Sequence, residues 1–215
     1  MNLRDAIKHV EKHKICLVFP IKNKSEPMSL WKSFYPRTKM KWEWDDSADS
    51  RVAKLWHLRE ELASSKKVVY AKWYQGRATL IAKKTFVNLL ALSRHVELER
   101  QFKYASASRM YDLLEDNSPL STKELKKHTE LQGKMFEAEF GRATKELWSS
   151  FKIVGVGEKD DGAFPSLLVG ATKLIHEDLW KKAASVSLED AQAQLLKDLG
   201  ADNLFWKYIA KTMKL

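Results

Sequence analysis

The chain of 215 residues has a single cysteine, Cys16, and no apolar run close to the roughly 20 residues that a membrane-spanning helix needs. One cysteine excludes an intramolecular disulfide and a metal site made of several cysteines. Cys16 lies in the apolar run ICLVF, which favours a small core residue over a reactive nucleophile. Residues 1–14 carry too many charges for a signal peptide. These absences predict a protein of the reducing cytoplasm, without a membrane segment.

Positive charge is unevenly distributed along the chain. The formal net charge is +10, from 38 Lys and Arg against 28 Asp and Glu. Residues 1–100 hold 21 basic and 11 acidic residues, whereas residues 101–215 hold 17 of each. A polyanion such as nucleic acid explains this asymmetry, and an incidental lysine-rich surface is the alternative. The neutral second half is suited to a protein partner.

Residues 49–95 predict a helix, a β-hairpin and a second helix. The first helix covers residues 49–62, with Asp46 or Ser47 as its N-cap. The segments VVYAKWY and RATLIA are rich in β-formers and flank Gln75-Gly76, which indicates a hairpin. Residues 83–95 return to helical spacing. The buried stripe of the first helix is expected to contain Val52, Leu55, Trp56 and Leu62.

Residues 106–175 repeat this pattern more completely. Three helical segments, 106–117, 121–131 and 134–150, follow one another, and Ser121 with Glu124 forms a capping box. Two strands on either side of the polar loop EKDDGAF come next. Three helices followed by a hairpin are typical of a winged helix. Residues 176–215 are predicted to be helical.

Three long segments resemble one family. They are the run ICLVFPIKNKSEPMSLW, the block from WEWDD to LWHLREELASSKKVVYAKWYQGRATLIA, and the stretch from MYDLLEDNSPLSTKELKK to FGRATKELWSSFKIVGVG. These segments are similar to the AlkZ-related proteins, which are short relatives of the YcaQ/AlkZ crosslink-repair DNA glycosylases. The resemblance covers most of the chain. It implies tandem winged-helix units that wrap around DNA.

The resemblance also implies where a glycosylase would carry its catalytic residues. In the true glycosylases an N-terminal Gln-apolar-Gln or Gln-apolar-Asp motif positions the water that cleaves the glycosidic bond. This chain has no glutamine before residue 60. Gln192-Ala193-Gln194 matches the motif but lies in a predicted C-terminal helix, so we assign it no catalytic role. The resemblance therefore favours DNA binding over glycosylase chemistry.

Cations surround the predicted first hairpin, and aromatic residues lie near its tip. The candidate nucleic-acid contacts are Lys66, Lys67, Lys72, Trp73, Arg77, Lys83 and Lys84. Cations with interleaved aromatic rings suit phosphate contacts together with base stacking or a wedge in the duplex. The alternative is that the Trp73 ring packs inward between lysines that only solvate the hairpin.

The helix predicted at 134–150 would be the DNA-reading helix of the second unit, yet its charges balance. Its exposed charged positions are Lys134, Arg142 and Lys145 against Glu137, Glu139 and Glu146. Carboxylates near phosphates weaken DNA binding. The second unit is therefore at least as well suited to a structural role or a protein contact.

The segment KWEWDD at 41–46 precedes the first helix and has two interpretations. In an extended segment Trp42 and Trp44 point to one side and Glu43 and Asp45 to the other. The tryptophans then cover the core while Asp45 or Asp46 caps the helix. Alternatively, a base stacks on a tryptophan, and one of the carboxylates binds it or activates water, as an enzyme that works on an extruded base requires.

Other motifs do not indicate a metal or a cofactor. His9 and His13 are four residues apart, but HVEKH lacks the glutamate next to the first histidine that a zincin uses. The string GVG at 155–157 lacks the third glycine and the helix of a dinucleotide-binding loop. We therefore expect neither a metal ion nor a cofactor.

The sequence as a whole predicts an α+β protein, mainly α, with tandem winged-helix units, β-hairpin wings and C-terminal helices. The units are expected at 1–97, 98–175 and 176–215, in one compact body. The predicted function is binding of double-stranded DNA without catalysis or with an activity still to be defined. One alternative is an N-glycosylase acting on alkylated or crosslinked bases, with Glu43, Asp45 and Asp46 as candidate catalytic residues. The other is a protein-interaction or transcription-regulator module.

Overall fold

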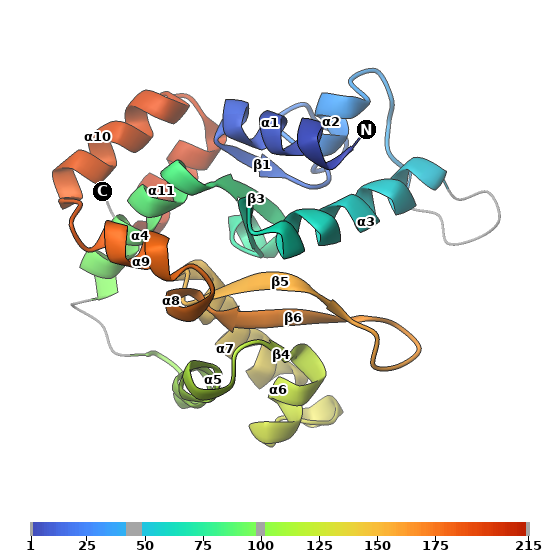
Figure 1. Cartoon of the computed structure of the whole chain (residues 1–215), viewed down its shortest axis with the longest axis vertical. Coiled ribbons are helices and arrows are strands. Elements are labelled where there is room, and N and C mark those ends of the chain that lie inside the picture. Colours follow the sequence, from blue (N-terminus) through green and yellow to red (C-terminus); the bar gives the residue numbers. More distant parts are fainter. Residues whose placement is uncertain (1, 42–48, 98–101, 214–215) are drawn as a thin grey trace.

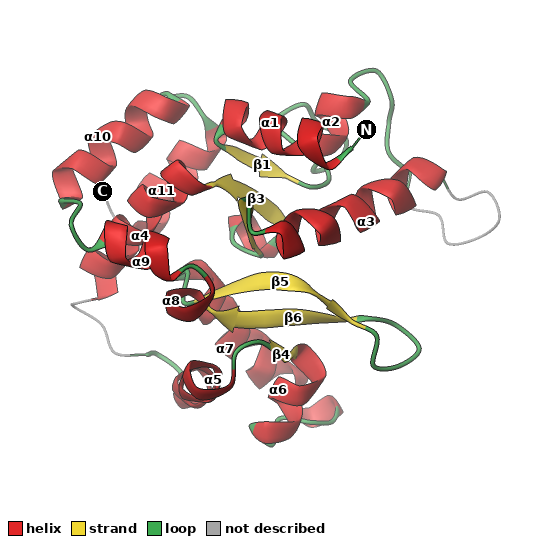
Figure 2. Cartoon of the chain, in the orientation of Figure 1, coloured by secondary structure: helices red, strands yellow, loops and turns green. Residues whose placement is uncertain are grey.

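A six-stranded antiparallel sheet lies in the middle of the molecule, with helices on both sides of it (Figures 1 and 2). A computed structural model of the chain describes residues 2–41, 49–97 and 102–213. The strand order is β1-β3-β2-β5-β6-β4. The fold is α+β and mainly α, as the sequence predicts.

The first three strands of this order belong to one repeat, at residues 3–82. Its elements follow the order helix, strand, helix, helix, strand, strand. They are α1 (Leu3–His13), β1 (Ile15–Leu17), α2 (Leu30–Phe34), α3 (Ser50–Ser65), β2 (Val68–Ala71) and β3 (Thr79–Ala82). The hairpin β2–β3 is the predicted one, with a 3-10 turn at Tyr74–Gly76. Of this repeat, only α3 and the hairpin are evident from the sequence. Strand β1 is three residues long and fully buried, so it has no alternating pattern.

The second repeat, at residues 105–171, has the same order of elements. They are α5 (Ala105–Asn117), β4 (Leu120–Ser121), α6 (Thr122–His128), α7 (Glu137–Ser149), β5 (Ile153–Lys159) and β6 (Ser166–Ala171). In both repeats the third strand lies between the first and the second. The predicted capping box between Ser121 and Glu124 starts α6. A 3-10 turn, Lys134–Phe136, precedes α7.

The two repeats join edge to edge through β2 and β5. Tyr70 pairs with Gly155 at this junction. A Cβ atom at Gly155 would overlap the ring of Tyr70, so the junction requires glycine there. Beside it, Arg59 of α3 forms a buried ion pair with Glu158 of β5. The first glycine of the GVG string therefore serves the packing of the two repeats.

The remaining helices cover one end of both repeats (Figure 1). They are α4 (Lys83–Glu97), α8 (Thr172–Ile175), α9 (Glu177–Ala183), α10 (Leu188–Leu199) and α11 (Leu204–Met213). Helix α4 packs against α9, α10 and α11. The buried side chains form one hydrophobic cluster that extends from Ala6 to Met213. The predicted helical C-terminal segment is thus confirmed, and it is part of the same core.

Two local predictions for α3 are wrong. The helix begins at Ser50 with Asp49 as its N-cap, and the Asp49 side chain accepts from the backbone N–H of Arg51. Neither Asp46 nor Ser47 is therefore the cap. Trp56 is also not part of the buried stripe, because the Arg59 guanidinium and the Phe19 ring stack on it at the surface.

Two predictions based on absences can be compared with the structure. Cys16 is buried, as expected for a core residue, and burial raises the pKa of its thiol to about 12. The thiolate needed for a nucleophile is therefore strongly disfavoured. Within the described part of the chain, no helix has the length and apolar character to cross a bilayer.

Candidate nucleic-acid interface

The cations predicted around the first hairpin lie at its two ends. Lys66, Lys67, Lys83 and Lys84 flank the base of the hairpin, whereas Lys72 and Arg77 flank its tip. A strand of this length separates the two groups by about 16 Å, at roughly 3.3 Å per residue. All six except the half-buried Lys83 are exposed. The hairpin therefore presents two basic patches.

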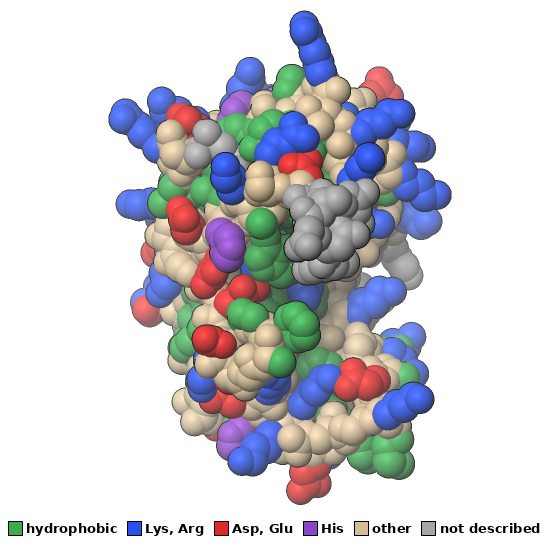
Figure 3. All heavy atoms as spheres, turned by 90° about the vertical axis from the view of Figure 1, so that its right-hand side faces the viewer, with side chains coloured by type: hydrophobic (Ala, Val, Ile, Leu, Met, Phe, Trp, Pro, Cys, Tyr) green, Lys and Arg blue, Asp and Glu red, His purple; other side chains and the backbone are tan. Residues whose placement is uncertain are grey.

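The exposed cations of the whole first half have no acidic partner among the residues that the structure describes. Among the described residues, none of them forms an ion pair with a carboxylate. Figure 3 shows Lys and Arg side chains crowding the upper part of one face, which Figure 1 places over the first repeat. These exposed cations are Arg4, Lys8, Lys12, Lys22, Lys24, Arg37, Lys39, Lys41, Lys54, Lys66, Lys67, Lys72, Arg77 and Lys84.

Trp73 does not point outward as a wedge. Its side chain is only 2% exposed, and its ring packs against Phe151 and Tyr208 at centroid distances of 5.3 and 5.2 Å. The indole is therefore part of the core in this structure, and the inward-packing alternative is the one observed. Base stacking on this ring would need the hairpin tip to open.

Helix α11 holds the tip of the first hairpin in place. The hydroxyl of Tyr208 donates to the backbone carbonyl of Trp73 and accepts from the backbone N–H of Gln75, each at 3.4 Å. Tyr74 packs edge-on against Phe205 of α11. Sequence reasoning missed these contacts because they join residues more than 130 positions apart.

A groove of about 600 Å³ opens where the hairpin tip meets the second repeat. Its walls come from the tip of β2–β3, the start of α6, α7, β6 and α11. Lys72 and Lys145 line it, and no Asp or Glu among the described residues does. Desolvation, followed by the nearby charge of Arg59, lowers the pKa of the Lys72 ammonium against the opposing effect of Glu158.

The glutamates of α7 contact neighbouring segments of the second repeat rather than the cations of α7 itself. Glu137 pairs with Lys126 of α6, and Glu139 lies 3.9 Å from Arg109 of α5. Glu146 accepts from the backbone N–H groups of Lys103 and Tyr104. These carboxylates are held by the second repeat itself. Among the described residues, Lys134, Arg142 and Lys145 have no carboxylate partner.

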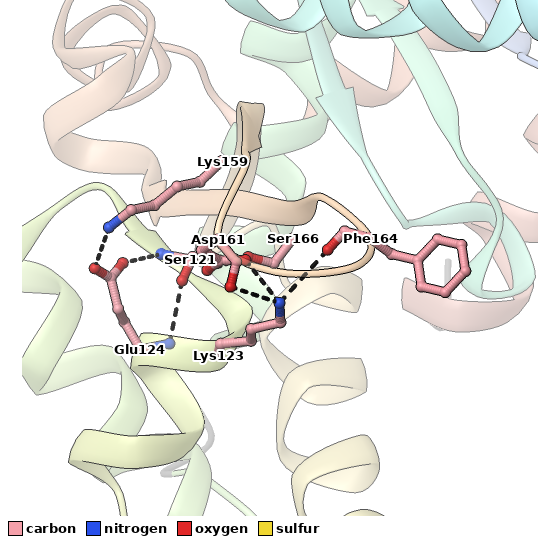
Figure 4. A network of polar contacts seen from close by, with 7 residues as sticks. All are labelled: Ser121, Lys123, Glu124, Lys159, Asp161, Phe164 and Ser166. Atoms are coloured by element: carbon pink, nitrogen blue, oxygen red, sulfur yellow. Dashed lines mark hydrogen bonds and ion pairs between the residues drawn. The ribbon is translucent and has the colours of Figure 1, made fainter.

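The loop between β5 and β6 is a second candidate element, and it is anchored by polar contacts (Figure 4). The Lys123 ammonium donates to the Asp161 carboxylate at 2.8 Å and to the carbonyl of Phe164. The Ser166 hydroxyl also donates to Asp161. Hydrogen bonds from Lys123 and Ser166 lower the pKa of Asp161 to about 2.

Phe164 is presented at the end of this anchored loop. Its side chain is 79% exposed and points away from the polar network (Figure 4). A large exposed aromatic ring on a fixed loop is the geometry of a wedge that enters a base step or a partner's pocket. The signal in the sequence was a single aromatic residue within the polar loop EKDDGAF, and the sequence analysis did not use it.

The segment KWEWDD, apart from Lys41, lies outside the described residues. Trp42, Glu43, Trp44, Asp45 and Asp46 all fall within 42–48, so their predicted roles in covering the core, binding a base or activating water stay predictions, whereas the helix cap is Asp49. His9 and His13 are described, and their rings stack at a centroid distance of 6.3 Å. In the described ranges, no group of three or more His, Cys, Asp and Glu side chains is arranged to hold a metal ion.

Comparison with known proteins assigns the chain to a family. A family model described as AlkZ related matches residues 1–204 of the 215. The chain belongs to the AlkZ-related family. The match spans both repeats of this AlkZ-related protein, all lining residues of the groove except Tyr208, and α10, and it ends at the first residue of α11. No curated protein and no solved structure matches the chain.

Proposed function

We propose that this AlkZ-related protein binds double-stranded DNA through two winged-helix units in tandem, as a non-catalytic relative of the DNA repair glycosylases. The order helix, strand, helix, helix, strand, strand, found in both repeats, is the order of a winged helix. The family assignment supports the relation to DNA repair. The surface of the protein that does not contact DNA would be available for a protein partner.

The observation that carries the proposal is the state of the cations in the first half of the chain. Most of them are exposed, and none of the exposed ones is paired with a described carboxylate, whereas the less exposed Arg51 and Arg59 pair with Asp49 and Glu158. Such a surface repels itself, and that cost is relieved when a polyanion binds and releases its counterions. Helix α7 adds to this surface, because its glutamates are held by α5, α6 and the segment before α5.

The second hairpin supplies a further contact in this proposal. Phe164 projects from the β5–β6 loop, and an aromatic wedge at a wing tip can enter the minor groove between base steps. The first hairpin would contribute phosphate contacts through its lysines and no wedge, since Trp73 is buried. The phosphate contacts and the aromatic wedge, both predicted for the first wing, are thus divided between the two wings in this proposal.

Base release is the rival activity, and two observations favour binding alone. The glutamine motif that the family resemblance implies for catalysis is missing from the N-terminal segment. The groove between the repeats has no described carboxylate in its lining to act as a general base. The structure describes neither Asp45 nor Asp46, so both stay candidate catalytic residues of the rival hypothesis.

A salt series with matched variants tests the proposal. We expect alanine at Lys66, Lys67, Lys83 and Lys84 to weaken duplex binding and to flatten its dependence on salt. The log–log slope should fall by about 0.9 for each phosphate that the protein no longer neutralises. Fluorescence anisotropy of a labelled duplex at several salt concentrations measures this slope.

The control variant removes the same number of positive charges from the C-terminal helices. Alanine at Lys181, Lys182, Lys197 and Lys211 gives the same net charge as the test variant. We expect this control to keep most of the wild-type slope. The proposal is wrong if the two variants bind equally weakly with equal slopes, or if the wild type has no salt-dependent affinity for a duplex.

A further inference from the structure

Gly141 lies inside α7, where glycine lowers the stability of the helix and no contact within the protein requires it. Glycine is a poor helix former and destabilises a helix interior relative to alanine. A Cβ atom added at Gly141 would have no heavy atom within 4 Å, so no neighbouring side chain or backbone requires its absence. Gly141 lines the groove between the repeats. A glycine with open space above it is suited to the close approach of a ligand.

The lining of the groove indicates what kind of ligand that would be. Lys72 from the hairpin and Lys145 from α7 contribute two positive charges, and neither is paired with a described carboxylate. Phe140, Trp148 and Tyr208 contribute aromatic carbon. Two cations next to an apolar surface match a ligand that has an anionic group and a flat ring. The groove volume of about 600 Å³ lies within the range of about 300–1,000 Å³ for small-molecule sites.

We propose that this groove binds one nucleotide, with its phosphate between Lys72 and Lys145 and its base against the aromatic side. The nucleotide can come from two sources, an unpaired position in a bound nucleic acid or a free mononucleotide. The first source rests on the proposed DNA binding and deepens it, because it gives the protein a preference for DNA with an unpaired nucleotide. The second source is independent of DNA binding.

The test compares two duplexes that differ by one unpaired nucleotide. Competition anisotropy gives the affinity for a fully paired duplex and for the same duplex with a single-nucleotide bulge. We expect the wild type to prefer the bulged duplex about fivefold or more, the lower limit for one base–aromatic contact. Titration with AMP, by calorimetry, tests the free nucleotide.

Gly141→Leu is the decisive variant because it fills the groove without disturbing the fold. Leucine is a better helix former than glycine, so the unfolding midpoint should rise by about 2–4 °C rather than fall. The preference for the bulged duplex and any AMP binding should disappear, while affinity for the paired duplex stays near the wild-type value. Lys145→Ala should reduce the preference, and Lys134→Ala, an exposed lysine outside the groove, should leave it unchanged.

The outcomes separate this inference from the proposed function. Equal wild-type affinity for the two duplexes without AMP binding overturns the inference and leaves duplex binding intact. A preference that survives Gly141→Leu also overturns it. If the wild type binds no duplex but binds AMP in a manner that Gly141→Leu abolishes, the proposed function fails and the nucleotide site stands.

Discussion

The two repeats share one order of elements and one strand order, yet their hairpins are used differently. The tip of β2–β3 is covered by α11 and the second repeat, with Trp73 buried and Tyr208 bonded to the backbone. The tip of β5–β6 presents Phe164 to solvent instead. The same local structure therefore serves as a packing element in one repeat and as an exposed element in the other.

The two repeats also differ in how many of their cations are paired with carboxylates. Most exposed cations of the first repeat have no described acidic partner, whereas the cations of the second repeat include Arg109, Lys123, Lys126 and Lys159, all paired with carboxylates. Surface ion pairs contribute little to stability, so the pairing matters more for the potential outside the protein. In the proposed function, the first repeat would attract the DNA at long range and the second repeat would supply a shaped contact.

The largest expected effect comes from truncating the aromatic residue at each hairpin tip. Trp73→Ala should lower the free energy of unfolding by about 3–5 kcal/mol, because it leaves a cavity between Phe151 and Tyr208. Phe164→Ala should change it by no more than about 0.5 kcal/mol, because the ring is exposed. Urea denaturation followed by circular dichroism measures both. Similar destabilisation of the two variants would remove the distinction between the hairpins.

Both hairpins could be predicted from the sequence. The burial of the aromatic residue at one tip and its exposure at the other could not. VVYAKWY and RATLIA have the composition of strands, and Gln75 and Gly76 adopt the positive φ angles that the turn requires. Whether the Trp73 ring faces inward depends on α11, which comes about 130 residues later. Local sequence patterns predict the strands and the turn of a hairpin. Whether the side chains at the hairpin tip are buried depends on which distant element packs on it.

The same reasoning applies to the candidate site. The cations of the first half were identified from composition, and the structure places most of them on the surface, with Arg59 buried in an ion pair as the exception. The partners of two α7 glutamates could not be predicted, because Lys126 and Arg109 lie on α6 and α5, and no local spacing predicts those contacts. The N-cap of α3 was misplaced by three residues, since Asp46 and Asp49 are equally good caps by residue type.

A second, smaller effect is expected from pH at the contact of the C-terminal helices with the first repeat. His176 is buried, and desolvation followed by the charge of Lys83 lowers the pKa of its imidazole to about 4. Asp178 raises this pKa, and Lys66 of the first repeat lowers it further. The imidazole is therefore neutral in the folded protein, whereas the unfolded chain takes up a proton below pH 6.5.

Stability from His176 is thus fully present above about pH 6.5 and falls away as the pH decreases toward about 4. The decrease should amount to about 3 kcal/mol across this interval. His176→Leu removes the titrating group, so its free energy of unfolding should depend less on pH in this range. Denaturation midpoints of the two proteins at several pH values provide the measurement. Parallel pH profiles would show that His176 does not contribute.

A local effect is expected at the β5–β6 loop, which is anchored through the Asp161 carboxylate, whereas the first hairpin tip is held by the Tyr208 hydroxyl. The hydrogen bonds from Lys123 and Ser166 lower the pKa of Asp161, so the anchor is present above about pH 3.8 and disappears as the pH falls through about 2. Asp161→Asn should imitate that change at neutral pH. Hydrogen exchange of residues 160–165 should then become faster, while exchange at the first hairpin tip stays the same. Equal protection of the loop in the variant and the wild type would contradict the anchoring role.

The smallest expected effect concerns the carboxylates before α3. Because Asp49 caps this helix, Asp49→Ala should cost about 1 kcal/mol of stability, whereas Asp45→Asn and Asp46→Asn should each change it by no more than about 0.5 kcal/mol.

The same substitutions test the rival enzyme hypothesis. A carboxylate that acts as a general base contributes about 10²–10⁴-fold in rate, so its removal would be evident in an assay of base release from alkylated DNA. We expect no base release from the wild type, because the glutamine motif is absent, and therefore no difference in either variant. Release by the wild type that Asp45→Asn or Asp46→Asn abolishes would show that the segment before α3, rather than the two hairpins, carries the function of the protein.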